Sequence, residues 1–258
     1  MRIRLTLAYD GTSYHGFQSQ VNGLAVQDVL EKALAELFGH PIRIMGASRT
    51  DAGVHAEGNV AVFDEVTRIP PDKIAFALNA RLPEDIRVIR SDRVADDFHP
   101  RFQRTVKTYE YRMLNKTFPD PLTRNTETHI YYALDDKKMD RAAKELIGTH
   151  DFLSFCSAGY SAKTTVREIY AANVRREGDR VIFRITGSGF LYNMVRILAG
   201  TLIEIGEGLR PEDDIPRILA AKDRAEAGPT AIPKGLVLIS IDYPDSVPVE
   251  QVADFANS

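Results

Sequence analysis

The chain has 258 residues, 44% hydrophobic and 27% charged, with 33 Lys and Arg against 36 Asp and Glu. This composition excludes a disordered chain and predicts one large domain or two small ones that share a core. A single cysteine excludes an intramolecular disulfide and a Cys-based zinc site, so we expect a reducing, cytoplasmic location. We also expect no signal peptide and no membrane span, because no stretch reaches the roughly 20 apolar residues that a bilayer requires.

The first hundred residues predict alternating strands and helices. Residues 2–9 alternate apolar and polar side chains and stop at Asp10-Gly11, which predicts a half-buried strand followed by a turn. Helical spacing of apolar residues over 27–39, with Gly39 as the stop signal, predicts an amphipathic helix. Short strands are expected over 42–45, 59–63 and 86–89, with a second helix that begins near residue 70.

The second half repeats this order. We expect a strand over 108–114, a helix over 139–147, strands over 169–175 and 181–186, a long helix over 191–205 and a last strand over 236–241. Each half therefore follows the ferredoxin-like order β-α-β-β-α-β, and the predicted class is α/β (α+β), two pseudo-twofold related halves on a mixed or antiparallel central sheet. The expected halves are residues 1–100 and residues 101–258, with a cleft between them.

Charge is distributed unevenly along the chain. Residues 1–100 carry a net charge of about −3, residues 101–200 about +6 and residues 201–258 about −6. Cations alternate with aromatic residues from position 101 to position 112, a pattern that suits a surface which binds phosphates and stacks bases, although a solvated strand edge explains it equally well. The acidic run Glu212-Asp213-Asp214 is expected to face away from such a surface. The candidate phosphate-binding residues are Arg101, Arg104, Lys107, Lys163 and Arg167.

The segment over residues 45–56 is the densest cluster of polar residues between small ones. Gly46 and Gly53 allow tight turns, and Arg49 and Asp51 share one side of an extended stretch. Judged from its residues alone, the segment fits a plain turn with Asp51 as a cap or ion-pair partner better than a catalytic site. Metal binding by Asp51 and His55 is a weaker alternative, since the histidines show no metal-binding spacing.

Four segments, which follow the family's order along the chain, resemble the tRNA pseudouridine synthase A family. They are Tyr9-Asp-Gly-Thr-Ser-Tyr-His-Gly-Phe-Gln18, Ser48-Arg-Thr-Asp-Ala-Gly-Val-His-Ala56, Lys107-Thr-Tyr-Glu-Tyr-Arg112 and Gly189-Phe-Leu-Tyr-Asn-Met-Val-Arg196. The chain departs from the family pattern at Phe17, where members often carry Trp, and at Ser48, where Gly is frequent.

The resemblance implies roles for individual residues. Asp51 corresponds to the catalytic aspartate, which attacks C1′ of the nucleotide or removes a proton from the sugar. Arg196 corresponds to the arginine that keeps this carboxylate ionised, and Tyr109 to an active-site tyrosine that stacks on the extruded uracil and moves the C5 proton. Arg49 corresponds to an arginine that guides the flipped base, and Leu236 to an apolar wall of the uracil pocket. Spacing alone would place Tyr109 and Leu236 in the core and Arg49 in a surface ion pair.

The resemblance implies a cofactor-independent isomerase that makes pseudouridine in the anticodon stem-loop of tRNA, at positions 38–40 in the family, and that works as a homodimer. Two other functions fit parts of the sequence. A non-catalytic RNA-binding module on doubled ferredoxin-like sheets would explain the basic middle segment. A glycoside or nucleoside hydrolase would need a second carboxylate opposite Asp51, for which Asp10 and Glu57 are the nearby candidates.

Overall fold

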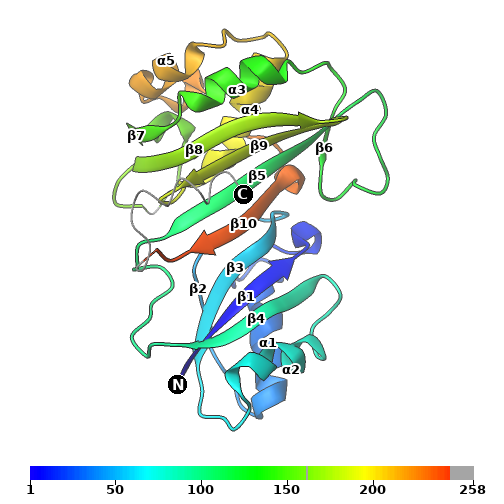
Figure 1. Ribbon diagram of the computed structural model, residues 1–258, viewed down its shortest axis with the longest axis vertical. Helices are drawn as coiled ribbons and strands as arrows, with labels where there is room; N and C mark the ends of the chain where they lie inside the picture. The colour runs from blue at the N-terminus through cyan, green and yellow to red at the C-terminus, as the bar shows by residue number, and fades with distance from the viewer. Residues whose placement is uncertain (161, 245–258) are drawn as a thin grey trace. The chain divides into compact units, whose positions relative to one another are not determined.

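The computed structural model describes residues 1–160 and 162–244, which form two compact units (Figure 1). The first contains Met1–Thr105 together with Leu238–Tyr243, and the second contains Val106–Val237. The division falls a few residues after the expected 100/101 boundary. The last strand also returns to the first unit, which a linear reading of the sequence does not reveal.

The first unit is built from β1 (Arg2–Tyr9), α1 (Val26–Phe38), β2 (Met45–Gly46), β3 (His55–Asp64), α2 (Ile74–Asn79) and β4 (Ile86–Val94). Its strands lie in the order β4-β1-β3, with β2 paired to the end of β3 and β10 (Leu236–Asp242) beyond β3. All of the described pairs are antiparallel. Apolar residues on alternate positions of β1 are fully buried, as the alternation predicts: Ile3, Leu5 and Leu7.

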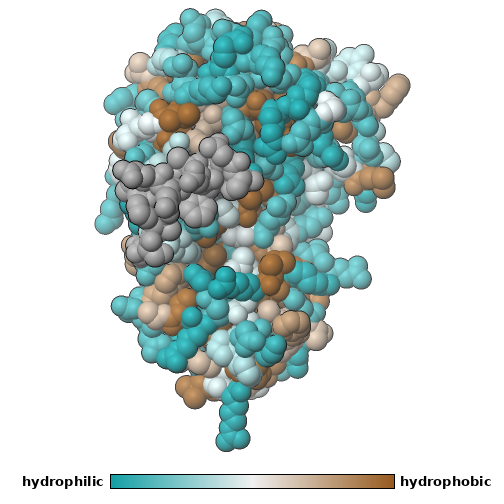
Figure 2. Space-filling view, in the orientation of Figure 1, coloured by the Kyte–Doolittle hydropathy of each residue, from teal (hydrophilic) through white to brown (hydrophobic). Residues whose placement is uncertain are grey.

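The second unit is built from β5 (Val106–Asn115), β6 (Thr128–Ile130), α3 (Asp136–Lys144), β7 (Gly148–Asp151), β8 (Val166–Glu177), β9 (Arg180–Gly187), α4 (Met194–Gly206) and α5 (Asp214–Ala221). The strand order is β5-β9-β8-β7, antiparallel throughout, while β6 pairs in parallel with β5 and makes the sheet mixed. Helix α4 carries apolar residues on nearly all of its faces, and it is therefore buried over most of its length. Hydrophilic residues cover the outer surface at α3 (Figure 2).

The α/β class and a mixed sheet are thus confirmed. Two of the expected boundaries differ for local reasons. Ile42 and Ile44 are buried, but only Met45 and Gly46 join the ladder. Helix α4 begins at Met194, because Asn193 has φ of 58° and cannot continue a helix backwards. Elements β6, β7 and α5 were not predicted, since each is short or lies in a polar segment. Among the described residues, no helix is long and apolar enough to cross a membrane.

Candidate active site

The loop over residues 47–54, between β2 and β3, carries Asp51. The backbone turns tightly there, with the Val54 N–H donating to the Asp51 carbonyl at 3.1 Å. Asp51 is half-buried, whereas its neighbours Ser48 and Thr50 are buried. The hydroxyls of Tyr9 and Thr50 share a 2.8 Å hydrogen bond, and Asn59 donates to Tyr9 at 3.0 Å and to the Ser48 carbonyl at 3.2 Å. Buried hydrogen bonds therefore fix the backbone that leads into Asp51.

The segment over residues 10–18 packs on this loop, and its glycines explain why. Gly16 has φ of 84°, and a Cβ there would collide with the Thr50 carbonyl oxygen. Gly11 approaches the Val54 backbone equally closely. Hydrogen bonds join the same surfaces, from the Phe17 N–H to the Thr50 carbonyl and from the Gly53 N–H to the Tyr14 carbonyl, both at 3.2 Å. Two of the four motif segments therefore meet as one structure.

Phe17 is the first of the two positions at which the sequence departs from the expected family pattern. The ring is fully buried and lies against the backbone of Gly46, where any side chain would strike it. It also packs 6.1 Å from the Tyr9 ring, between ring centroids. Phenylalanine therefore supplies the apolar support for the start of the loop, and the departure from the family pattern leaves that support in place.

Two of the expected cations of the first unit gather beside the loop. Arg49 is exposed on it, and Arg101 donates from Nε to the Gly46 carbonyl at 2.6 Å. Burial, together with the nearby positive charge of Arg49, lowers the pKa of Arg101 from its usual value. The two guanidinium groups therefore lie close enough to repel each other, which favours an anion beside them. Arg104 is exposed three residues further along the chain.

The expected site residues of the second unit surround the turn between β9 and α4. Tyr109, on β5, is 6% exposed and meets the ring of Phe190 edge-to-face, with ring centroids 5.2 Å apart. Lys107 lies opposite Gly187 in the β5–β9 ladder, at the base of this turn. Arg167 approaches the turn from β8, since a Cβ on Gly189 would lie 3.9 Å from its Nε. The structure thus brings these three sequence-predicted residues to one turn.

Arg196 stands in the first turn of α4 and is held at both ends of its guanidinium. Its Nε donates to the Ala231 carbonyl at 2.7 Å, and Nη1 donates to the Asn193 side-chain oxygen at 2.9 Å. The Ala231 N–H donates back to the Arg196 carbonyl at 3.1 Å. This fixed, planar fork suits a carboxylate partner, because a guanidinium can present two parallel N–H groups to it.

The segment that follows Ala231 leads directly to Leu236. Tyr111 donates to the Ile232 carbonyl at 2.9 Å and bonds Thr128 at 2.8 Å. Burial raises the pKa of Tyr111 to about 12, so the hydroxyl stays protonated at neutral pH. Gly235 lies so close to Tyr111 and Thr128 that only glycine fits. Leu236 is 5% exposed where β10 begins.

The two remaining cations expected to bind phosphate in the second unit are Lys163 and Arg167. Lys163 is exposed before β8. Burial lowers the pKa of Arg167 from its usual value. Asp51, Arg49 and Arg101 belong to the first unit, while Tyr109, Arg196 and Leu236 belong to the second. Sequence reasoning gave no role to Phe190, although it lies within a matched motif. It also missed the Ala231 carbonyl, because a backbone acceptor has no sequence signal.

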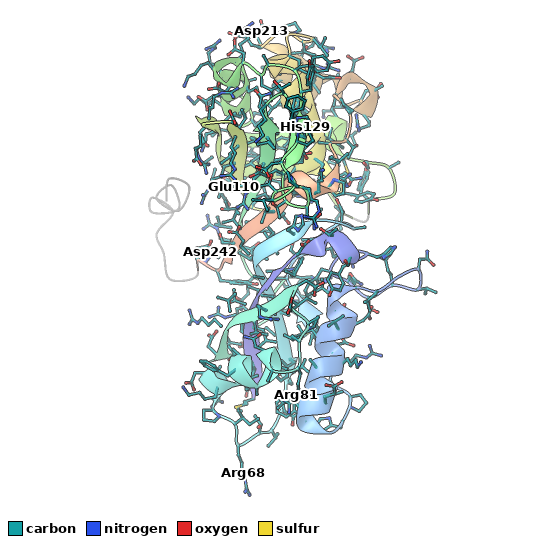
Figure 3. The ribbon with its side chains drawn as sticks, turned by 90° about the vertical axis from the view of Figure 1, so that its right-hand side faces the viewer. Arg68, Arg81, Glu110, His129, Asp213 and Asp242 are labelled. Atoms are coloured by element: carbon teal, nitrogen blue, oxygen red, sulfur yellow. The ribbon has the colours of Figure 1, made fainter. Side chains whose placement is uncertain are left out.

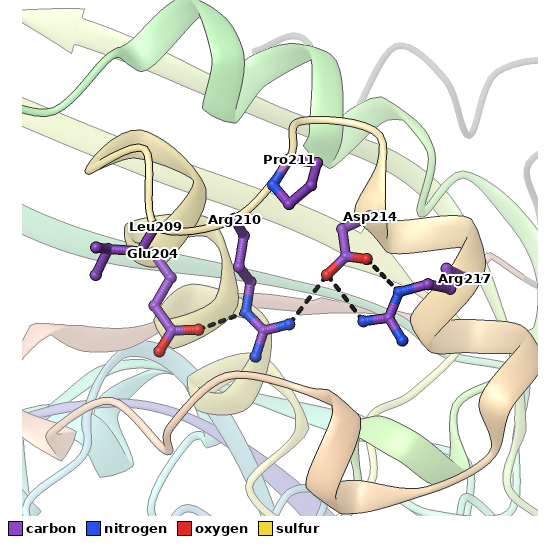
Figure 4. A pocket seen from close by; sticks show the side chains of 6 residues that line it. All are labelled: Glu204, Leu209, Arg210, Pro211, Asp214 and Arg217. Atoms are coloured by element: carbon purple, nitrogen blue, oxygen red, sulfur yellow. Dashed lines mark hydrogen bonds and ion pairs between the residues drawn. The ribbon is translucent and has the colours of Figure 1, made fainter.

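The sequence-based expectation that Glu212, Asp213 and Asp214 form an acidic surface is wrong for Asp214. Asp214 is buried and accepts from Arg217 at 2.5 Å and from Arg210 at 3.0 Å (Figure 4). Asp213 does lie on the surface at the end of the second unit (Figure 3). Asp214 therefore anchors α5 to the chain after α4 rather than adding to a negative surface. Within residues 1–160 and 162–244, no three His, Cys, Asp or Glu side chains gather as metal ligands would.

Comparisons with known proteins agree with the motif resemblance over most of the chain. The family model for tRNA pseudouridine synthase matches residues 6–103 and 142–244. A tRNA pseudouridine synthase A of Acetivibrio thermocellus is 46% identical over 241 residues, 93% of this chain and 99% of that protein. Proteins of the same name from Exiguobacterium sibiricum and Limosilactobacillus reuteri are 45% and 44% identical, over 95% and 94% of this chain and 98% and 96% of their own lengths.

Proposed function

The chain belongs to the tRNA pseudouridine synthase family, isomerases that convert uridine in tRNA to pseudouridine, and from this premise we propose that its targets are uridines of the anticodon stem-loop. We propose further that Asp51 begins the reaction. The observation that supports Asp51 is the construction of its loop, which buried hydrogen bonds and glycine contacts hold from two directions. A carboxylate that must meet one sugar atom needs such a fixed backbone.

The reaction moves one bond within the nucleotide. The C1′–N1 bond breaks, the uracil turns, and a C1′–C5 bond forms while C5 loses a proton and N1 gains one. The nucleotide undergoes no net oxidation or reduction and loses no group, so the chemistry balances without a cofactor. Asp51 either attacks C1′ directly or removes a sugar proton, and both routes need it ionised.

Arg196 is the proposed partner that keeps Asp51 ionised. Its guanidinium is already oriented by the Ala231 carbonyl and by Asn193, so little side-chain entropy is lost when it binds a carboxylate. We assign this pairing from the motif match. Tyr109 is proposed to stack on the uracil and to accept or relay the C5 proton, with Phe190 fixing the tilt of its ring.

The remaining site residues bind the RNA. Arg49 is proposed to guide the flipped base, and Leu236 to form an apolar wall beside it. The phosphate contacts are proposed for Arg101, Arg104, Lys107, Lys163 and Arg167. The active form is proposed to be a cytoplasmic homodimer, which sedimentation at micromolar protein concentration tests: a single monomer mass would reject it.

The direct test maps pseudouridine in an unmodified tRNA pool treated with the protein. The expected result is pseudouridine in the anticodon stem-loop and nowhere else. Pseudouridine confined to another arm would overturn the proposed target. RNA binding without any product would favour the non-catalytic RNA-binding module, and release of free uracil would favour the hydrolase.

A further inference from the structure

An aromatic pair flanks Arg101 in the first unit. His99 and Phe102 are stacked nearly in parallel, with ring centroids 3.9 Å apart and planes 19° apart. Phe102 nevertheless remains 85% exposed, so the ring face turned away from His99 is open to solvent. An apolar ring held in this way is costly to leave in water, and its open face has the size and shape of a stacking partner for a base.

The backbone beneath this pair is fixed. Phe98 and Pro100 are buried, and the carbonyl of Phe98 accepts from Arg2 at 2.8 Å. The carbonyl of Pro100 accepts from the Tyr243 hydroxyl at 3.0 Å. The residues on either side of His99 therefore anchor the segment, and the pair is arranged before any ligand arrives.

Arg101 ties the pair to the catalytic loop. Its N–H donates to His99 Nδ1 at 3.1 Å, which orients the imidazole ring, while its side chain reaches the Gly46 carbonyl at 2.6 Å. Burial lowers the pKa of Arg101, and the positive charge of Arg49, two residues before Asp51, is near enough to lower it further. The aromatic pair is thus linked through Arg101 to Gly46, where the loop with the proposed catalytic carboxylate begins, and Arg101 in turn has Arg49 as a neighbour.

We propose that His99 and Phe102 form a stacking platform for a nucleobase that flanks the target uridine. The inference rests on the proposed function. Flipping one base out of a stem-loop removes the stacking partner of its neighbour, and an exposed ring can replace that partner. The adjacent Arg49 and Arg101 would hold the phosphates on either side. The platform recognises any base by its flat face and adds affinity without selecting sequence.

The chain contains no tryptophan, which gives a direct probe. Phe102→Trp places the only tryptophan at the platform, and its fluorescence should be quenched when an unmodified anticodon stem-loop RNA binds. The matched control is Phe76→Trp, at an exposed phenylalanine of α2 in the same unit. Comparable fluorescence changes in both variants, or none in either, would overturn the proposal.

The energetic test uses Phe102→Ala and Phe102→Leu. Both should raise the Kd for RNA by about 5- to 150-fold, the range that loss of one stacked base predicts, while Phe102→Trp keeps it near the wild-type value. An abasic nucleotide beside the target should weaken binding by the wild type but not further weaken Phe102→Ala. Full additivity of the two changes would overturn the platform.

Two results separate this inference from its premise. If the wild type makes no pseudouridine, the proposed function fails on that measurement alone. If the wild type is active, and Phe102→Ala alters only the sedimentation of the protein and leaves RNA affinity unchanged, the ring contacts a second copy of the chain and the platform is rejected.

Discussion

Replacing Gly16 by alanine tests whether the segment over residues 10–18 positions the loop that carries Asp51. Gly16 has φ of 84°, which costs an L-residue about 1–2 kcal/mol. The new Cβ would also lie closer to the carbonyl oxygen of Thr50, the residue before Asp51, than the 3.0 Å below which such contacts are essentially never found. Because the Cβ is fixed to the backbone at position 16 and the oxygen belongs to the backbone of Thr50, the backbone must shift by about half an ångström. A displacement of this order at a catalytic group is expected to lower kcat by about 10- to 100-fold.

Gly39→Ala is the matched control. Gly39 ends α1 with φ of 81°, and no atom lies within 4 Å of a Cβ built there. Gly39→Ala should therefore lose about 1–2 kcal/mol in urea unfolding from the backbone conformation alone, and Gly16→Ala should lose at least as much because the contact with Thr50 adds to it. Only Gly16→Ala should lose activity in a single-turnover assay with tRNA. Equal activity in the two variants would refute the view that Gly16 holds the loop through its contact with Thr50.

Other predictions concern the second unit. Arg196→Lys should lower kcat by about 100-fold with little change in RNA affinity, whereas Arg167→Ala should weaken binding and reduce its salt slope by about 1; equal effects on binding would contradict this division of roles. Asp214→Asn should destabilise the protein at pH 7. Bonds from Arg217 and Arg210, opposed by burial, lower the pKa of Asp214, so its contribution is present above pH of about 4 and disappears as pH falls through the folded pKa. Urea unfolding should show the variant and wild type converging in acid, and a difference that does not shrink as pH falls would reject the assignment. Tyr111→Phe should cost about 1–2 kcal/mol of unfolding free energy, since two buried hydrogen bonds are lost; an unchanged denaturation midpoint would mean that these bonds contribute nothing net.

Much of the fold could be predicted from the periodicity of apolar residues. Strand β1 and helix α1 have long, regular patterns with clear stop signals, and both were located to within a residue or two. Short elements carried no such signal. Strand β6 has three residues, and helix α5 begins at a buried aspartate whose role depends on arginines three and four residues away.

The proposed site residues could be selected from the sequence, but the contacts that support them could not. Asp51, Arg196 and Tyr109 were found through motifs, whereas their spacing alone favoured ordinary structural roles. Gly16 and the Ala231 carbonyl act through backbone geometry, which a sequence does not display. Phe102 was passed over because an aromatic residue among cations reads as part of a charge pattern, and its exposure is visible only in three dimensions.

The role of Asp51 is best tested by the release of tritium from uracil C5 in tRNA labelled at that position, because C5 must lose its hydrogen when the new glycosidic bond forms. The wild-type protein should release tritium and Asp51→Asn should release none, with RNA affinity preserved in the variant. Release by Asp51→Asn at the wild-type rate would contradict it.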